Sequence, residues 1–269
     1  MNLLLRIVSG AVLIGIVGAA LWLGTASVAA LIGAGVLVAC WELAGLLGKL
    51  RIAPPWWLLY PLALWLAIRL ALPAAYQDAQ WPLLAALSAG LLAAVLLRVS
   101  FDRWAGAVAA AVYAGFGLGF FLALYLWHGA DSDHFGLRLV GLVLLAVIAG
   151  DVAAYFTGSA VGRHAFFQRL SPRKTLEGAV GGAVATIVVA ALAGPPLIGI
   201  NAAAGAGMGA LIAIAAQGGD LAESALKRQA GVKDSSALIP GHGGLLDRID
   251  SLVLVGPVVY CYLRLIAFP

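Results

Sequence analysis

The sequence predicts an all-α integral membrane protein that crosses the bilayer about nine times. Of its 269 residues, 63% are hydrophobic and only 10% are charged, whereas a soluble domain is roughly half apolar and a quarter charged. Such a chain cannot cover a water-facing surface with polar side chains, which excludes a soluble globule, and the same hydrophobicity excludes a disordered chain. The apolar runs do not alternate as barrel strands do, so the spans are expected to be helices.

Each expected helix is an apolar run of roughly 20 residues, the length that crosses a hydrocarbon core of about 30 Å. The runs lie at 7–23, 26–47, 56–73, 82–98, 104–127, 137–158, 178–194, 196–217 and 251–267. The first run resembles a secretory signal, with Arg6 before it and Ser27-Val28-Ala29 after it. Because the apolar character resumes at once, without a soluble domain to export, we expect this run to be retained as a span.

Basic residues fall in every second loop, which favours a cytoplasmic N-terminus, because Lys and Arg near spans are retained on the cytoplasmic side. The inside segments would hold Arg6, Lys49, Arg51, Arg98, Arg103, Arg163, Arg169, Arg173, Lys174, Lys227, Arg228, Lys233 and Arg248. The other basic residues, Arg69, Arg138 and Arg264, lie near the outer ends of spans, where long side chains can reach the interface.

Two regions are expected: N-terminal transmembrane helices over 1–135, with about five spans, and a catalytic transmembrane region over 136–269 with cytoplasmic loops at 159–177 and 217–250. Glycines four residues apart predict that helix backbones approach closely, because small residues at this spacing pack helices in lipid. These pairs are Gly115/Gly119, Gly158/Gly162, Gly178/Gly182 and Gly205/Gly209.

The first polar loop follows the sixth expected span. Asp151 falls within that span, where an ionised carboxylate costs at least a few kcal/mol unless it is paired or hydrated, so a functional role is favoured over a packing contact. Tyr155 lies one turn on, on the same face. Ser171 as N-cap and Pro172 at the first helical position predict a helix start. Its free amides, with Arg173 and Lys174, would bind phosphate or anchor the loop to anionic headgroups.

The second polar stretch runs from Gln217 to Ser251. If its first part is helical, Asp220, Glu223, Ser224 and Lys227 share one face. Further polar residues follow in three groups: Lys233-Asp234, then Pro240-Gly241-His242-Gly243-Gly244, then Asp247-Arg248-Ile249-Asp250. The glycines permit positive φ and therefore a close approach of amides to a bound group.

Carboxylates with oxygen-only neighbours suit a hard cation such as Mg²⁺, and no cysteine or second histidine is near enough for zinc. Basic residues around such a centre are typical of phosphoryl-type transfer, in which they offset developing negative charge. His242 is a candidate general base, phosphate donor or turn residue. The base role is the least favoured, because a phosphate nucleophile is already ionised at neutral pH.

The final third of the chain resembles the phosphatidate cytidylyltransferase family, also called CDP-diacylglycerol synthases. The family's C-terminal signature reads Ser-x-apolar-Lys-Arg, four residues, Lys-Asp and, after a short spacer, Pro-x-His-Gly-Gly-apolar-x-Asp-Arg-apolar-Asp. It is matched without departure from Ser224 to Asp250. The blocks at Gly219-Asp220, Gly150-Asp151 and Ser171-Pro172 also look like blocks of this family, so the resemblance covers roughly residues 150–251.

The resemblance implies a multi-pass enzyme of the inner (cytoplasmic) membrane, active on the cytoplasmic side, that takes part in phospholipid biosynthesis. It would join CTP and phosphatidic acid to give CDP-diacylglycerol and pyrophosphate. Mg²⁺, a monovalent cation such as K⁺ and a homodimer are implied with it, and nucleic acid is not an expected partner. Carried over by position, the metal acids would be Asp220 and Asp247, with Asp250 and Asp151 as further candidates.

The residues and the resemblance together assign the remaining roles as expectations. The expected catalytic set is Lys227, Arg228, Lys233, Asp234, His242 and Arg248, of which the basic residues would neutralise phosphates. The expected substrate-binding set is Ser224, Gly243, Gly244, Arg173, Lys174 and Tyr155. Within it, Arg173 and Lys174 would hold the lipid phosphate or the departing pyrophosphate.

Two other functions stay open at this point. Another CTP-dependent membrane enzyme, such as a polyprenol kinase or an archaeal lipid cytidylyltransferase, would use a similar nucleotide site with a different acceptor, and a kinase would release CDP instead of pyrophosphate. A transporter with an ion site around Asp151 is the second alternative. Transporters usually show paired broken helices in two related halves, a pattern that this sequence lacks.

Overall fold

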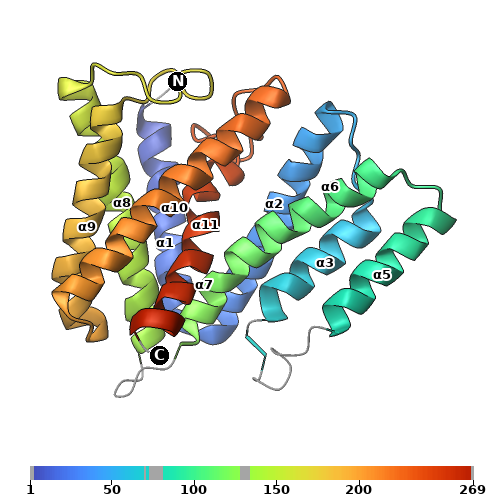
Figure 1. Cartoon of the computed structure of the whole chain (residues 1–269), viewed down its shortest axis with the longest axis horizontal. Helices are drawn as coiled ribbons and strands as arrows, with labels where there is room; N and C mark the ends of the chain where they lie inside the picture. The colour runs from blue at the N-terminus through green and yellow to red at the C-terminus, as the bar shows by residue number, and fades with distance from the viewer. Residues whose placement is uncertain (1–2, 70, 73–80, 128–133, 268–269) are drawn as a thin grey trace. The chain divides into compact units, whose positions relative to one another are not determined.

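The computed structural model describes residues 3–69, 71–72, 81–127 and 134–267, and within these ranges the chain forms helices and no strand (Figure 1). The all-α prediction is therefore confirmed for the described residues. In chain order the elements are α1 (Leu3–Leu23), α2 (Thr25–Lys49), α3 (Trp56–Arg69), α5 (Trp81–Leu96), α6 (Phe101–Ala111), the π-helical η1 (Val112–Phe116), α7 (Gly117–Tyr125), α8 (Phe135–Val161), α9 (Leu176–Ile198), α10 (Ala202–Gln229), α11 (Leu246–Tyr262) and the π-helical η2 (Leu263–Ala267).

Seven helices in the described part of the chain are long and apolar enough to cross a membrane, which makes the chain a multi-pass membrane protein. They are Leu4–Leu23, Thr25–Lys49, Phe101–Tyr125, Phe135–Val161, Leu176–Ile198, Ala202–Gln229 and Leu246–Ala267. Two further apolar helices, Trp56–Arg69 and Leu87–Leu96, are shorter. Residues 70 and 73 of the third expected span lie outside the described residues. The count of nine crossings stays a prediction.

The helices form two compact units. The first comprises Met1–Ala123 and Leu226–Arg248, and the second comprises Leu124–Ala225 and Ile249–Pro269. The signature segment after Ala225 is therefore grouped with the N-terminal helices up to Arg248. The division expected near residue 135 stays a prediction.

In the first unit, α3 packs against α2, α6 and η1. A Cβ atom added at Gly115 would overlap the carbonyl of Ala63, and one added at Gly119 would lie 2.6 Å from the Cα of Ala67. This first glycine pair therefore lies where the backbone of α3 approaches, as its spacing predicts.

In the second unit, α8 and α9 run side by side (Figure 1). A Cβ at Gly178 would lie 2.8 Å from the carbonyl oxygen of Ala154, and one at Gly182 would lie 2.8 Å from that of Gly150. Gly209 of α10 approaches Ile187 of α9 in the same way, at 2.8 Å. Close helix packing at these predicted positions is confirmed, and it draws together the helices that carry the polar residues of this unit.

The prediction that a helix starts at Ser171 is wrong, because α9 begins at Leu176. The preceding residues are held in a short antiparallel bridge between Ala165 and Thr175, in which the Phe166 amide donates to the Lys174 carbonyl. Thr175 is the N-cap instead, and its hydroxyl accepts a hydrogen bond from the Gly178 amide at 3.1 Å. The loop thereby presents Arg173 and Lys174 beside the start of α9.

Candidate active site

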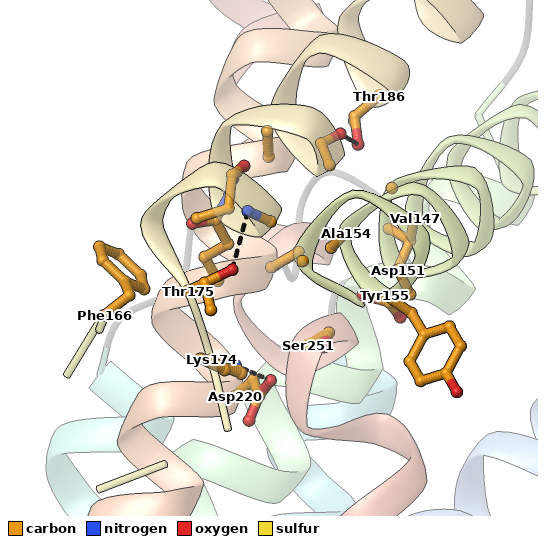
Figure 2. Close-up of a pocket in the computed structure, with 18 of the residues that line it drawn as sticks. Val147, Asp151, Ala154, Tyr155, Phe166, Lys174, Thr175, Thr186, Asp220 and Ser251 are labelled. Carbon is orange, nitrogen blue, oxygen red and sulfur yellow. Dashed lines mark hydrogen bonds and ion pairs between the residues drawn. The ribbon is translucent and has the colours of Figure 1, made fainter. Parts of the chain in front are cut away.

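A pocket of about 570 Å³ lies within the second unit, among α8, α9, α10 and the first residues of α11 (Figure 2). The glycines that let α8 and α9 approach also leave space on its wall, since Gly150, Gly158, Gly178 and Gly182 all line it. Its polar lining residues are Asp151, Tyr155, Ser159, Arg173, Lys174, Thr175, Thr186, Gln217, Asp220 and Ser251.

The ammonium group of Lys174 and the carboxylate of Asp220 form an ion pair at one end of this pocket, where Figure 2 shows the two side chains facing each other. Each side chain is 31% exposed. Ser224, one turn further along α10, donates its hydroxyl to Asp220 Oδ1 at 3.4 Å. A loop cation and a helix carboxylate, which the sequence places 46 residues apart, are thus brought together and remain accessible from the pocket.

Asp151 and Tyr155 come to the same pocket from α8. Both residues are exposed, and Figure 2 shows the Tyr155 ring pointing away from Lys174 and Asp220. Arg173 is exposed on the pocket lining as well. Asp250 belongs to the same unit without lining the pocket, and its Oδ1 accepts a hydrogen bond from the Ser251 amide at 2.6 Å. The structure therefore gathers one part of the expected site here.

The first unit holds a second group of expected residues, where the loop 230–245 joins the end of α10 to the start of α11. The expected polar loop is shorter than 217–250, because α10 continues as a helix through Lys227 and Arg228 to Gln229. Lys227 Nζ donates to Asp247 Oδ1 at 2.5 Å, and the two side chains are only 11% and 5% exposed.

The second carboxylate oxygen of Asp247 binds the loop. Asp247 Oδ2 accepts hydrogen bonds from the Ser235 amide and hydroxyl, both at 2.9 Å, and from the Gly244 amide at 2.7 Å. The Gly244 amide, expected to bind phosphate, therefore has an internal partner in this structure. Gly243 has φ +82°, the positive value that its predicted role requires.

His242 lies between the first helix and the start of α11. Its Nδ1 is 2.8 Å from Ser9 Oγ, while Arg6 donates to the Gly241 carbonyl at 3.0 Å and Arg248 to the His242 carbonyl at 3.1 Å. Burial lowers the pKa of His242, and the charges of Arg248 and Arg6 act in the same direction. The surroundings thus favour the neutral ring.

Sequence reasoning missed Glu42, a buried acid of α2 that is 2% exposed. Its Oε1 accepts hydrogen bonds from the Ser236 hydroxyl at 2.6 Å and the Leu245 amide at 2.9 Å, and its Oε2 accepts from the Leu246 amide at 2.6 Å. An acid within an apolar run is the signal that singled out Asp151, and the same rule applied to residues 26–47 finds Glu42.

The remaining expected residues lie on the surface of the loop or helix end. Arg228, Lys233 and Asp234 are exposed, and Arg228 donates to the Val232 carbonyl at 3.2 Å. Within the described ranges, no three His, Cys, Asp or Glu side chains gather in a group that could hold a metal ion. A metal here would depend on few carboxylates together with other oxygen ligands, as Mg²⁺ sites that include substrate phosphates do.

Comparisons with known proteins agree with the motifs. A model of the cytidylyltransferase family matches residues 4–266. The phosphatidate cytidylyltransferase of Brucella suis is 41% identical over 182 residues, which are 65% of this chain and 64% of that protein. The protein of the same name from Thermotoga maritima is 40% identical over 163 residues, 58% of each chain, and that from Bacillus subtilis is 35% identical over 170 residues, 62% of this chain and 60% of its own. The match thus spans less than two thirds of each relative's length.

Proposed function

Because the chain belongs to the cytidylyltransferase family, we propose that it transfers the cytidylyl group of CTP to phosphatidic acid, giving CDP-diacylglycerol and pyrophosphate. The observation that carries this proposal is the family match over residues 4–266, joined to relatives named phosphatidate cytidylyltransferase at 35% to 41% identity. A pocket lined by both carboxylates and cations, within a multi-pass membrane protein, supports a reaction between a charged nucleotide and a lipid.

In the proposed reaction, a phosphate oxygen of phosphatidic acid attacks the α-phosphorus of CTP in line. A new phosphorus–oxygen bond forms, the bond to the bridging oxygen breaks, and pyrophosphate leaves with that electron pair. The attacking phosphate is already ionised, so no base has to remove a proton, which accords with a structural role for the neutral His242. The residues of this chain orient the phosphates and offset their charge.

Lysine and arginine side chains supply that offset. In the pocket, Lys174 and Arg173 are the candidates for binding the lipid phosphate or the departing pyrophosphate, with Tyr155 as a further substrate contact. Ser224, which donates to Asp220 from one turn along α10, is another candidate substrate contact. In the first unit, the candidates for neutralising the triphosphate are Lys227, Arg228, Lys233 and Arg248. The exposed Lys233 and Arg228 are accessible to a nucleotide from water, whereas Lys227 forms an ion pair with Asp247.

We propose Mg²⁺ as the cofactor, with Asp220 and Asp247 as the first candidate ligands, Asp151 and Asp250 as further ones, and K⁺ as a candidate second cation. The donor set fits a hard cation, because these side chains offer only oxygen. When bound, the metal ion withdraws charge from phosphate oxygens. Asp220 is the more accessible acid, since its side chain is 31% exposed, whereas Asp247 is 5% exposed and accepts four hydrogen bonds.

The alternation of basic loops supports a finer membrane arrangement, which we propose as well. The N-terminus would be cytoplasmic, the chain would cross the inner membrane nine times, and the site would face the cytoplasm. From the resemblance to the phosphatidate cytidylyltransferase family we also propose that the protein acts as a homodimer. A cytoplasmic site suits the substrates, because CTP is confined to water while the diacyl chains stay in lipid.

The deciding experiment incubates the full-length protein, purified in detergent, with CTP labelled at the α-phosphate, phosphatidic acid and Mg²⁺. We expect labelled CDP-diacylglycerol and an equal amount of pyrophosphate, with no product after chelation of the metal. Release of CDP with a phosphorylated lipid would identify a CTP-dependent kinase instead. Formation of CDP-lipid only from another lipid phosphate would overturn the proposed acceptor, and the absence of any labelled lipid would overturn the proposal.

The matched control for this assay is Asp102→Asn. Asp102 is an exposed acid in the first turn of α6, outside the pocket and outside the signature. It should retain wild-type activity, while Asp220→Asn, which changes an acid of the pocket in the same way, should lose it.

A further inference from the structure

We propose that Glu42 of α2 is a positioning residue for the reaction: its buried carboxylate holds the segment from Ser236 to Leu246 in the conformation in which Asp247 serves catalysis. The catalytic part of this inference rests on the proposed function. Its structural part rests on the hydrogen bonds of Glu42 within the first unit.

The contacts of Glu42 are concentrated at the start of α11. The first amides of a helix have no partner within the helix, and a carboxylate placed there satisfies them and interacts favourably with the helix dipole. Glu42 accepts the amides of Leu245 and Leu246 with different oxygens, and it adds the Ser236 hydroxyl from the preceding loop. One side chain of α2 thus binds both the loop and the first residue of α11.

Glu42 and Asp247 accept hydrogen bonds from different residues of this segment. Asp247 binds Ser235 and the Gly244 amide, while Glu42 binds Ser236 and the amides of the next two residues. Neighbouring serines and three consecutive amides are therefore shared out between two carboxylates from different helices. A shift of the segment away from Glu42 would also move the donors that orient Asp247.

The close approach of Glu42 explains the glycine at position 244. A Cβ atom there would overlap Ser235 Oγ and Glu42 Oε1 and would lie 2.8 Å from Glu42 Cδ. The backbone at Gly244 can pass between the two groups only because it carries no side chain. This requirement belongs to the contact with α2, and it is independent of any phosphate contact at Gly244.

A simple helix anchor would not need a charge at this position. Burying a carboxylate costs several kcal/mol unless its oxygens are hydrogen-bonded, and an apolar side chain of similar size would pack α2 at lower cost. Glu42 accepts three hydrogen bonds and donates none, a capacity that glutamine lacks because its amide nitrogen is a donor. The arrangement therefore favours a role in holding the loop.

The test compares Glu42→Gln with Leu46→Ala in the full-length protein. Leu46 lies one turn further along α2 with 0% exposure and packs only through its apolar side chain, so its replacement destabilises the helix without removing a hydrogen bond from the loop. We expect Glu42→Gln to lower kcat by about 10- to 100-fold with a much smaller change in KM for CTP, because small misplacements of catalytic groups have effects of this size. Leu46→Ala should keep the wild-type kcat per folded molecule.

Two further measurements separate positioning from stability. Glu42→Asp retains an acceptor-only side chain and should recover part of the lost kcat. Because Ser236 acts through Glu42, Glu42→Gln combined with Ser236→Ala should have the same kcat as Glu42→Gln alone. A folded Glu42→Gln protein with the wild-type kcat, or independent losses in the double variant, would overturn the inference.

Hydrogen exchange at Gly244, Leu245 and Leu246 provides a readout that does not depend on activity. Exchange at these amides should accelerate in Glu42→Gln and stay unchanged in Leu46→Ala. If the wild-type protein makes no CDP-lipid, the proposed function fails, and accelerated exchange would still support the loop-holding role. If the wild-type protein is active and exchange at these amides does not respond to Glu42, only the inference about Glu42 fails.

Discussion

Lys227 Nζ lies 2.5 Å from Asp247 Oδ1, and this ion pair joins the last turns of α10 to the first turn of α11 within the first unit. The pair is more deeply buried than the pair of Lys174 and Asp220, whose side chains are each 31% exposed. Burial changes the contribution of each pair to the stability of the fold. Removing one partner of a buried pair leaves an uncompensated buried charge, whereas the remaining partner of an accessible pair is solvated by water.

Lys227→Met should therefore be strongly destabilising. We expect the free energy of unfolding to fall by about 3–5 kcal/mol, since the Asp247 carboxylate would stay buried without its cation. Thermal unfolding in detergent measures this loss. Combining the change with Asp247→Asn should restore part of the stability but no activity, and a Lys227→Met protein as stable as wild type would show that the pair is dispensable for folding.

Lys174→Met and Asp220→Asn should each lower activity strongly while changing the stability of the fold very little. An accessible ion pair contributes at most about 1 kcal/mol, so we expect a small change in Tm. The loss of kcat/KM for CTP should be about 100-fold, the size seen when one charge-stabilising group is removed. Asp220→Asn should also need more Mg²⁺ for half-maximal activity. An unchanged Mg²⁺ requirement would remove Asp220 from the metal ligands.

Gly182→Val should push α8 and α9 apart. A Cβ at this position would lie 2.8 Å from the Gly150 carbonyl oxygen, and overpacking of this kind typically costs about 1–3 kcal/mol. Gly141→Val on α8 is the matched control, because no atom lies within 4 Å of its added Cβ. Both variants place the same β-branched residue in a helix, so the difference between their Tm values isolates the helix contact. Equal Tm values would argue against it.

The stability of the protein should depend on His242 below neutral pH. Burial, with Arg248 and Arg6, lowers the pKa of His242 from its ordinary value of 6.5, so the unfolded chain takes up a proton before the folded protein does. The contribution is therefore present above pH 6.5 and lost as the pH falls through the folded pKa. Between pH 7.5 and pH 5.5 the wild-type Tm should fall further than that of His242→Asn. An identical fall in both proteins would contradict this.

Much of the fold follows from patterns that are local in the chain. Apolar runs predict helices because lipid leaves the backbone no other partner, and the Gly178/Gly182 spacing predicts where α8 packs against α9. The helix start at Ser171 was mispredicted for a physical reason. A capping pattern competes with tertiary hydrogen bonds, and the pairing of residues 164–166 with 174–176 prevailed.

The candidate site was predictable as a set of residues but not as a set of contacts. The motifs identified Lys174 and Asp220 separately, and only the packing of α8, α9 and α10 brings them into one pocket. The role of Glu42 could not be predicted, because its hydrogen-bond partners lie 194 to 204 residues away in the chain. The rule that singled out Asp151 identifies Glu42 as an acid within an apolar run, but no periodicity or spacing near it shows which donors it binds.

The contact between Arg6 and the Gly241 carbonyl has a consequence for biogenesis. The two residues are 235 positions apart. At about 5–20 residues per second, a ribosome therefore needs roughly 10–50 s after adding Arg6 to reach Gly241. During that interval the nascent chain already holds α1 without the interaction that later secures it. The signature loop can therefore contact α1 only after the whole segment between Arg6 and Gly241 has been synthesised.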